Sequence, residues 1–262
     1  MRFLIALFTA AAVIALQASA DDRADSSYEL LHLSGANVRW PERDPLTPRV
    51  VTYALLDREE QFADARNCSR MGPVANALGP SKIEVSSARE EIARAFQLWS
   101  DVALVDFREI AYGTNVDMTP DIIIGAQTIP MGYAFTDVRT GDRESGTFRD
   151  LDRSLICLNP SRTWKIGFDG NLATYDLMYI FAHEIGHALG LDHPSASGQI
   201  MSFRYEESFR ELQLGDIDGV IAIYGARNAT ARADIDPLRP SRQGADLLGW
   251  NLRKRLDLIG RQ

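Results

Sequence analysis

Three of the four histidines in this chain of 262 residues lie within the stretch HEIGHALGLDH. His183 and His187 are four residues apart, so on a helix they project from one face with their Cβ atoms about 5–6 Å apart. Two neutral imidazoles at that separation can bind one metal ion. Gly190 can end the helix and turn the chain, which brings His193 back as a third ligand. Three histidines leave the fourth tetrahedral position of zinc open, as in catalytic zinc sites.

Glu184 follows the first of these histidines in the sequence. It lies about 100° around the helix axis from His183, so its carboxylate can reach a water molecule on the metal without binding the metal. Zinc lowers the pKa of bound water from about 15.7 to about 7 and polarises a substrate carbonyl. The sequence therefore predicts that Glu184 takes a proton as this water attacks an acyl bond, and later gives it to the leaving amine.

A chance occurrence of this spacing is a poor explanation. At typical residue frequencies, the fixed positions of HExxHxxGxxH arise by accident about once in 10⁵ chains of this length.

Residues 1–20 have the three parts of a signal peptide. A positive charge at Arg2 precedes an apolar run from Phe3 to Leu16, and Ala18-Ser19-Ala20 is a small-x-small cleavage pattern. The alternative is a membrane anchor, but this run of about 14 residues is shorter than the ~20 that span a bilayer. We expect a cleaved signal peptide and an exported mature chain with no transmembrane segment.

Composition narrows the class of protein further. The formal net charge is −8, or −9 without Arg2, and charges of both signs are scattered along the sequence. A nucleic-acid partner is not expected, because a phosphate-binding face needs clustered Lys and Arg. Cys68 and Cys157 are the two cysteines. In an exported protein such a pair indicates one disulfide, with two free thiols as the alternative.

The elements that must position the histidines can be read from the spacing of apolar residues. Helices are predicted over 86–102, 174–189 and 212–224, the last ending at Gly225. Strands are predicted over 49–56, 105–111, 121–125, 132–136 and 154–158. Residues 57–82 and 137–152 are expected to be loops because they are polar and rich in turn residues. An early helix, several strands and late helices describe an α+β fold with a mixed sheet.

The two ends of the chain are expected to lie outside this domain. Residues 21–39 are polar and unpatterned, which predicts a mobile arm. The tail over 226–262 contains ADLLGWNLRKRLDLIG, with an apolar helical stripe beside Arg and Lys. This amphipathic segment either docks on its own domain or contacts a membrane surface.

The motif HEIGHALGLDH, with Met201 eight residues after it, resembles the metzincin zinc peptidases. HALGLDH together with LGDIDGVIAIYG is similar to the matrixins. This resemblance implies a catalytic domain over 40–225 with a twisted mixed sheet packed on helices, one of which binds zinc. It also implies that Met201 lies on a turn beneath the metal and that substrate pairs with an edge strand at GYAF. Residue by residue, it assigns catalysis to Glu184 and zinc ligation to His183, His187 and His193.

The resemblance further implies a pocket for the side chain that follows the cut. Tyr179, four residues before the first zinc histidine, would lie at its bottom, and Tyr205, four after Met201, would form part of its wall. These two residues leave room for aliphatic side chains of medium size, such as Leu or Met. Tyr179 fits ordinary core packing equally well.

Several positions depart from the matrixin pattern. Pro194 stands where the family usually has Ser or Thr, and Phe203 replaces the zinc-binding Tyr of the related astacins and serralysins, so no fifth ligand is expected. The second zinc of matrixins needs further histidines, and only His32 remains, so we expect one zinc ion. Calcium is a further candidate, with Asp169 and the carboxylates of 137–152 as ligands. No cysteine precedes the first strand, so cysteine-dependent latency is not expected.

The sequence as a whole predicts a secreted or periplasmic zinc endopeptidase that acts on protein or peptide substrates. Two alternatives remain open at this point: a zinc-containing binding module without turnover, and a hydrolase of a cell-wall amide. The carboxylate of Glu184 argues against the first, because a binding module does not need it.

Overall fold

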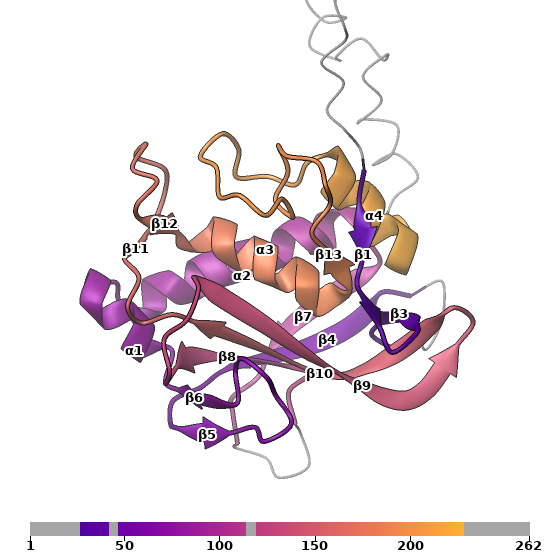
Figure 1. Cartoon of the computed structure of the whole chain (residues 1–262), viewed down its shortest axis with the longest axis horizontal. Helices are drawn as coiled ribbons and strands as arrows, with labels where there is room; N and C mark the ends of the chain where they lie inside the picture. The colour runs from indigo at the N-terminus through magenta and orange to yellow at the C-terminus, as the bar shows by residue number, and fades with distance from the viewer. Residues whose placement is uncertain (1–26, 42–46, 114–118, 228–262) are drawn as a thin grey trace, which may run out of the picture.

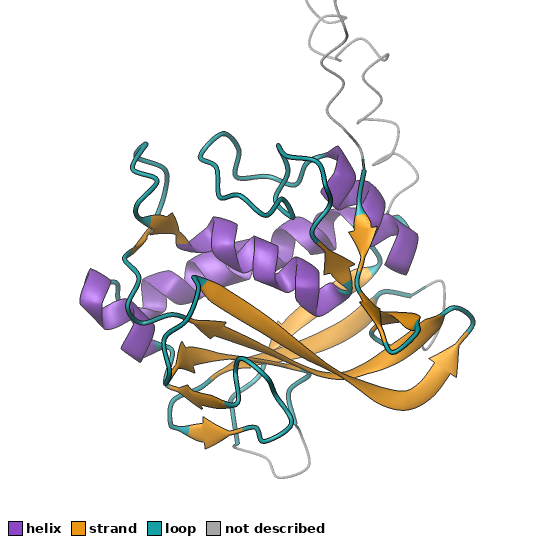
Figure 2. Ribbon diagram, viewed as in Figure 1, coloured by secondary structure: helices purple, strands orange, loops and turns teal. Residues whose placement is uncertain are grey.

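The computed structural model describes residues 27–41, 47–113 and 119–227. A twisted sheet forms one layer, and the long helices α2 and α3 lie across one face of it (Figures 1 and 2). The expected signal peptide over 1–20 and the amphipathic segment of the tail lie outside the described residues. No helix of the described part of the chain is long and apolar enough to cross a membrane.

The sheet is mixed, as predicted. Its main path runs β2-β3-β10-β8-β4-β7, and β9 lies along the other side of β10. Pairing is parallel from β3 through β10, β8 and β4 to β7, and antiparallel between β9 and β10 and between β2 and β3. The strands are β2 (His32–Leu33), β3 (Ala36–Arg39), β4 (Arg49–Leu55), β7 (Val105–Glu109), β8 (Ile122–Gln127), β9 (Ala134–Ser145) and β10 (Phe148–Leu158).

Strand β9 has a free edge. It pairs with β10 alone among the described strands, so its outer N–H and C=O groups can accept another extended chain. Figure 1 shows this edge running beneath α3.

Helices α2 (Val85–Val102) and α3 (Leu177–Leu189) pack on the sheet, and α4 (Leu214–Tyr224) packs on these two helices. Helix α3 is buried nearly all round. Two tryptophans from other elements donate to its carbonyl groups, Trp99 to Ala182 at 3.0 Å and Trp40 to Ala188 at 2.9 Å. These two bonds, nearly two helical turns apart, hold α3 in one orientation above the sheet.

The N-terminal arm differs from the expectation. Residues 27–39 are part of the domain: β1 (Glu29–Leu30) pairs with β13 (Leu191–Asp192), and β3 pairs with β10. Val38 is fully buried. The expected mobile arm over 21–39 therefore does not describe these residues. Strands of two to four residues are too short to show a period-2 pattern in the sequence.

Ala226 and Arg227, which were expected to belong to the C-terminal tail, also pack on the domain. The guanidinium of Arg227 donates to the carbonyl of Val105 at 2.9 Å and pairs with Asp106, and Ala226 bridges to Ala103. The first two residues of the expected tail over 226–262 therefore pack on the end of α2 and the start of β7, and the others lie outside the described residues.

Residues 137–152 are not the loop that was expected. They belong to the long hairpin of β9 and β10, which turns at residues 146–147. The last four residues of β9 are all exposed and polar, so the alternation that marks a strand is missing there. The predicted loop over 57–82 likewise contains β5 (Glu60–Gln61), β6 (Arg70–Gly72), α1 (Ala75–Leu78) and a short 3₁₀ helix, η1 (Gly79–Ser81).

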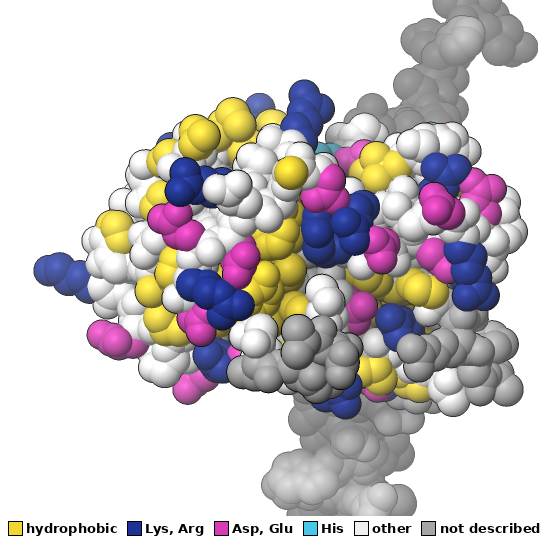
Figure 3. Space-filling model, turned by 90° about the horizontal axis from the view of Figure 1, so that it is seen from below, with side chains coloured by type: hydrophobic (Ala, Val, Ile, Leu, Met, Phe, Trp, Pro, Cys, Tyr) yellow, Lys and Arg dark blue, Asp and Glu magenta, His cyan; other side chains and the backbone are white. Residues whose placement is uncertain are grey.

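Cys68 and Cys157 form a disulfide with a Cα–Cα distance of 5.8 Å. It joins the segment before β6 to β10 on the sheet face opposite α3, within a small apolar cluster that includes Leu56, Phe62, Met71 and Leu155. Figure 3, which views the molecule from that side, shows acidic and basic side chains interspersed around apolar surface.

This disulfide closes a loop of 89 residues, which predicts a large effect on stability. The double variant Cys68→Ala/Cys157→Ala should unfold with a free energy about 2–5 kcal/mol below that of the wild type, because the unfolded chain gains entropy when the cross-link is lost. Urea denaturation of both proteins measures this difference. Wild-type protein unfolded with a reductant should reproduce the loss, and an unchanged free energy of unfolding in the double variant would contradict the prediction.

Candidate active site

The three histidines come from α3 and the segment that follows it. His183 and His187 lie on α3, which ends where Gly190 takes up the left-handed conformation with φ of 105°. A Cβ at Gly190 would lie 2.3 Å from the carbonyl oxygen of Val38, so the turn needs glycine for both its conformation and its space. Strand β13 then leads the chain back to His193.

The Nε2 atoms of the three histidines face one another. His183 and His193 bring theirs to 3.0 Å, and that of His187 lies 3.2 Å from each. Nitrogens bound tetrahedrally to zinc at ~2.0–2.1 Å lie about 3.3 Å apart. The described residues contain one group of metal-binding side chains this close, and these histidines form it.

The second nitrogen of each helical histidine is held by a backbone carbonyl. Nδ1 lies 2.8 Å from the oxygen of Ile200 in His183, and 2.9 Å from that of Leu191 in His187. A carbonyl only accepts, so each Nδ1 carries the proton and each Nε2 keeps its lone pair for a metal. Burial lowers the pKa of His183 well below its usual value and that of His187 to about 4, which keeps both rings neutral at neutral pH.

A turn packs against α3 beside the histidines. Met201 on this turn is buried against α3, where a Cβ at Gly186 would lie 2.2 Å from its sulfur. Glycine at position 186 therefore lets the turn approach the helix closely. The turn also supplies the carbonyl of Ile200 that orients His183.

Asp216 holds this turn, and the sequence did not single it out. Its carboxylate accepts the N–H groups of Ile200 and Met201, both at 2.9 Å, and that of Gln213 at 2.8 Å. Burial raises the pKa of Asp216, while these backbone bonds lower it. Its place three residues after Gln213, at the start of α4, is a capping-box position, the one local signal that pointed to it.

Glu184 lies beside the histidines and is buried. Thr136 on β9 donates its hydroxyl to Glu184, with Oγ1 at 2.7 Å from Oε2. Burial raises the pKa of the Glu184 carboxyl to about 7, and the bond from Thr136 acts in the opposite direction. The sequence did not single out Thr136, because nothing local marks a residue that lies 48 positions from its partner.

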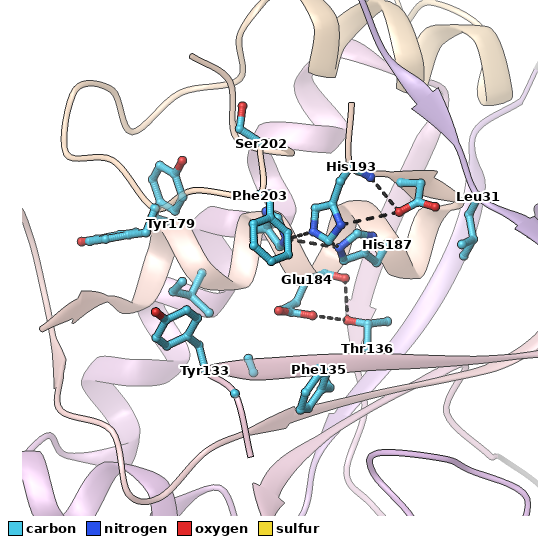
Figure 4. Close-up of a pocket in the computed structure, with 16 residues that line it drawn as sticks. Leu31, Tyr133, Phe135, Thr136, Tyr179, Glu184, His187, His193, Ser202 and Phe203 are labelled. Carbon is cyan, nitrogen blue, oxygen red and sulfur yellow. Dashed lines mark hydrogen bonds and ion pairs between the residues drawn. The ribbon is translucent and has the colours of Figure 1, made fainter. Parts of the chain in front are cut away.

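A cavity of about 490 Å³ opens over these residues. The start of β9, α3, β13 and the turn after Met201 line it. Figure 4 shows Tyr133 and Tyr179 to one side of the histidines and Leu31 to the other, with Glu184 and Thr136 below them. The cavity thus extends in both directions from the three Nε2 atoms, along the free edge of β9.

Residues 76–225, more than half of the chain, match the family model described as matrixin. The chain belongs to the matrixin family. Matrixins are zinc metalloendopeptidases, so the observed family agrees with the motif, the α+β fold and the three-histidine group. Helix α3, Glu184 and Met201 all lie within the matched span.

Among the relatives of this matrixin, the hatching enzyme of Paracentrotus lividus is 32% identical over 168 residues, which cover 62% of this chain and 27% of the relative. Matrix metalloproteinase-19 of Homo sapiens is 30% identical over 211 residues, covering 75% and 37%. Stromelysin-3 of Xenopus laevis is 34% identical over 159 residues, covering 56% and 29%. The chain therefore matches roughly a quarter to two-fifths of the length of these relatives.

Tyr179 and Tyr205 both line the cavity of this matrixin. Their rings meet edge to face with centroids 5.0 Å apart. The hydroxyl of Tyr205 accepts from the N–H of Asp176 at 3.0 Å and donates to Glu207 at 2.7 Å. Tyr179 also packs against Phe168 and Phe209, so the same ring borders the cavity and belongs to the core.

Three other features considered in the sequence analysis can now be placed: Phe203, His32 and the acidic residues proposed as calcium ligands. Phe203 contacts the ring of His193, with centroids 5.3 Å apart, and its side chain has no ligand atom. His32 lies beside Asn37 on the N-terminal strands. Two of the carboxylates considered for calcium have other partners: Asp137 accepts the N–H groups of Asn67 and Cys68, and Asp169 pairs with Lys165.

The histidine group generates a prediction about metal content. Native mass spectrometry should find one zinc ion per chain, and His187→Ala should lose it because two ligands hold zinc poorly. His32→Ala is the matched control and should keep the ion. Two zinc ions per chain, both retained in His32→Ala, would contradict the expected ligand supply.

Proposed function

We propose that this chain is an exported zinc endopeptidase that hydrolyses protein or peptide substrates. The observation that carries the proposal is the convergence of three Nε2 atoms beside a buried glutamate, in a cavity bordered by a free strand edge. We infer that the catalytic domain comprises the expected residues 40–225 together with the N-terminal strands and Arg227.

The histidines fit a zinc ion in number, spacing and protonation. Zinc, when bound by His183, His187 and His193, supplies a positive charge that polarises the substrate carbonyl and lowers the pKa of water. Glu184 is the proton carrier in this proposal: its carboxylate takes a proton from the attacking water and delivers it to the leaving nitrogen. Hydrogen bonds that Nδ1 of His183 and of His187 donates to backbone carbonyl groups keep these two imidazoles in the ligating tautomer.

The substrate binds as an extended strand in this proposal. It adds to the free edge of β9 near residues 132–136, where main-chain hydrogen bonds provide affinity and the neighbouring cavity provides specificity. The side chain after the cut enters the cavity beside Tyr179 and Tyr205. Met201 supports the histidines through its packing on Gly186 of α3.

Export is part of the proposal. Residues 1–20 have the pattern of a signal peptide, and the disulfide of Cys68 and Cys157 is of a kind that persists in oxidising compartments. Many matrixins act outside the cell, which agrees with this destination.

Replacement of Glu184 tests the chemistry. Glu184→Gln should keep its zinc and lose about 10²–10⁴-fold in kcat, because the amide cannot carry the proton. Cleavage of casein and of a peptide library, with peptidoglycan as a third substrate, measures this loss. Glu90→Gln on the exposed face of α2 is the matched control and should retain full activity.

Unchanged peptide cleavage by Glu184→Gln would overturn the proposed mechanism. Hydrolysis of peptidoglycan alone by the wild type would replace peptides with a cell-wall amide as the substrate. Absence of turnover on all three substrates would favour a zinc-containing binding module.

Tyr179 tests the pocket. Tyr179→Ala should widen the accepted residue after the cut from Leu and Met toward large aromatic side chains, because the shortened side chain deepens the cavity. Mass spectrometry of the products of a peptide library gives this profile. Tyr53→Ala, which removes a buried ring stacked on Phe96 away from the cavity, is the control. An unchanged profile in folded Tyr179→Ala would assign this tyrosine to the core alone.

A further inference from the structure

Thr136 connects the proposed substrate-binding strand to the proposed proton carrier. Its Oγ1 lies 2.7 Å from Oε2 of Glu184 and 2.9 Å from the carbonyl oxygen of the same residue. Figure 4 shows both interactions crossing the space between β9 and α3. Within the described part of the chain, this hydroxyl is the hydrogen-bond partner of the Glu184 carboxylate.

The position of Thr136 is set by its strand. Its backbone lies opposite Ile156 in the antiparallel pair of β9 and β10. The next residue, Asp137, points to the other face, where its carboxylate accepts the N–H groups of Asn67 at 2.6 Å and Cys68 at 2.7 Å. The disulfide joins Cys68 to β10. Thr136 is therefore held by its pairing with β10. Its neighbour Asp137 is held by the segment with Asn67 and Cys68 on the other face of the sheet.

The hydroxyl has one proton and faces two acceptors on the same residue. When it donates to Oε2, that oxygen is fixed, and Oε1 is the oxygen that no described side chain binds. A glutamate side chain has three rotatable bonds, the last of which is broad, so a second point of attachment is needed to define where its carboxylate lies. The bond from Thr136 provides this attachment from outside the helix.

We propose that Thr136 is a positioning residue that sets the orientation of the Glu184 carboxylate relative to the substrate. The inference rests on the proposed function. Because β9 both receives the substrate and carries Thr136, one strand determines where the peptide and the proton carrier lie. Oε1 is then the atom that takes and returns the proton. A misplacement of about 1 Å in such an arrangement costs about 10²-fold in rate.

The simpler role for this hydrogen bond is to satisfy buried polar groups. The two roles differ in what they change. A purely structural bond affects folding stability or metal content, whereas a positioning bond affects kcat and leaves substrate binding, zinc and folding in place.

Three variants separate these roles. Thr136→Val keeps the shape of the side chain and removes the hydroxyl, and Thr136→Ser keeps the hydroxyl. Thr140→Val makes the same isosteric change elsewhere on β9, where Thr140 pairs with Leu151. We expect Thr136→Val to lower kcat about 10–100-fold, the range typical of outer groups that orient the residues of a metal site, with KM within about twofold of the wild type. Thr136→Ser should restore kcat to within about threefold, and Thr140→Val should leave it unchanged.

Three further measurements accompany the kinetics: zinc content, melting temperature and a crystal structure of Thr136→Val. The first two should match the wild type, and the third should show the Glu184 carboxylate displaced or in more than one conformation. A wild-type kcat in Thr136→Val, or a carboxylate that stays in place, would overturn the inference. So would a loss of kcat in both Thr136→Val and Thr136→Ser that follows a loss of zinc or of folded protein.

Failure of the proposed function has a different signature. If wild-type protein binds zinc and cleaves none of the substrates, the endopeptidase proposal fails and the inference fails with it. If wild-type protein cleaves and Thr136→Val cleaves equally well, the inference alone fails.

Discussion

The candidate active site depends on three neutral imidazole nitrogens held within 3.2 Å of one another. Lone pairs at this distance repel one another unless a cation lies between them, so the placement of the three rings needs support from their surroundings. Carbonyl groups of Ile200 and Leu191 supply part of it by binding the opposite ring nitrogens. The remainder comes from close packing, in which glycine at 186 and 190 admits the turn with Met201 and the strand with Val38. These contacts explain why much of the fold is built around α3.

The cavity over the histidines lies where α3 crosses near the free edge of β9. Trp99 and Trp40 bind carbonyl groups of α3 and fix its height and direction. The hairpin of β9 and β10 brings the free edge beneath it, and Thr136 bridges the two layers. The carboxylate of Asp216, at the start of α4, accepts the N–H of Met201 and so links α4 to the turn that contains Met201. Each layer of the domain therefore contributes one contact to the immediate surroundings of the histidines.

Several residues serve the core and the cleft together. Tyr179 packs with Phe168 and Phe209 and also borders the cavity. Tyr205 is held at its hydroxyl by Asp176 and Glu207, so its ring is fixed where it lines the same space. Since these side chains do both, the shape of the pocket is coupled to the packing of the domain. This chain covers a minor part of the length of its relatives. Its disulfide lies on the sheet face opposite α3, whereas Thr136 lies on the face toward α3.

The sequence by itself determined the local features. The spacing of His183 and His187, the turn at Gly190 and the helices over α2, α3 and α4 follow from the period of 3.6 residues and from the conformations open to glycine. These are relations between neighbours in the chain, so composition and spacing express them directly. The matrixin motif extended this reading to Met201 and to the domain as a whole.

The tertiary structure alone decided the rest. Residues 27–39 join the domain through pairing with β10 and β13, and residues 137–152 form strands because β9 and β10 hydrogen-bond to each other. Thr136 reaches Glu184 across 48 residues, and Asp216 reaches Met201 across 15. Such contacts depend on the register of a sheet and on the height of a helix above it. Those quantities are set by the packing of the whole domain, so no local pattern of residue types encodes them.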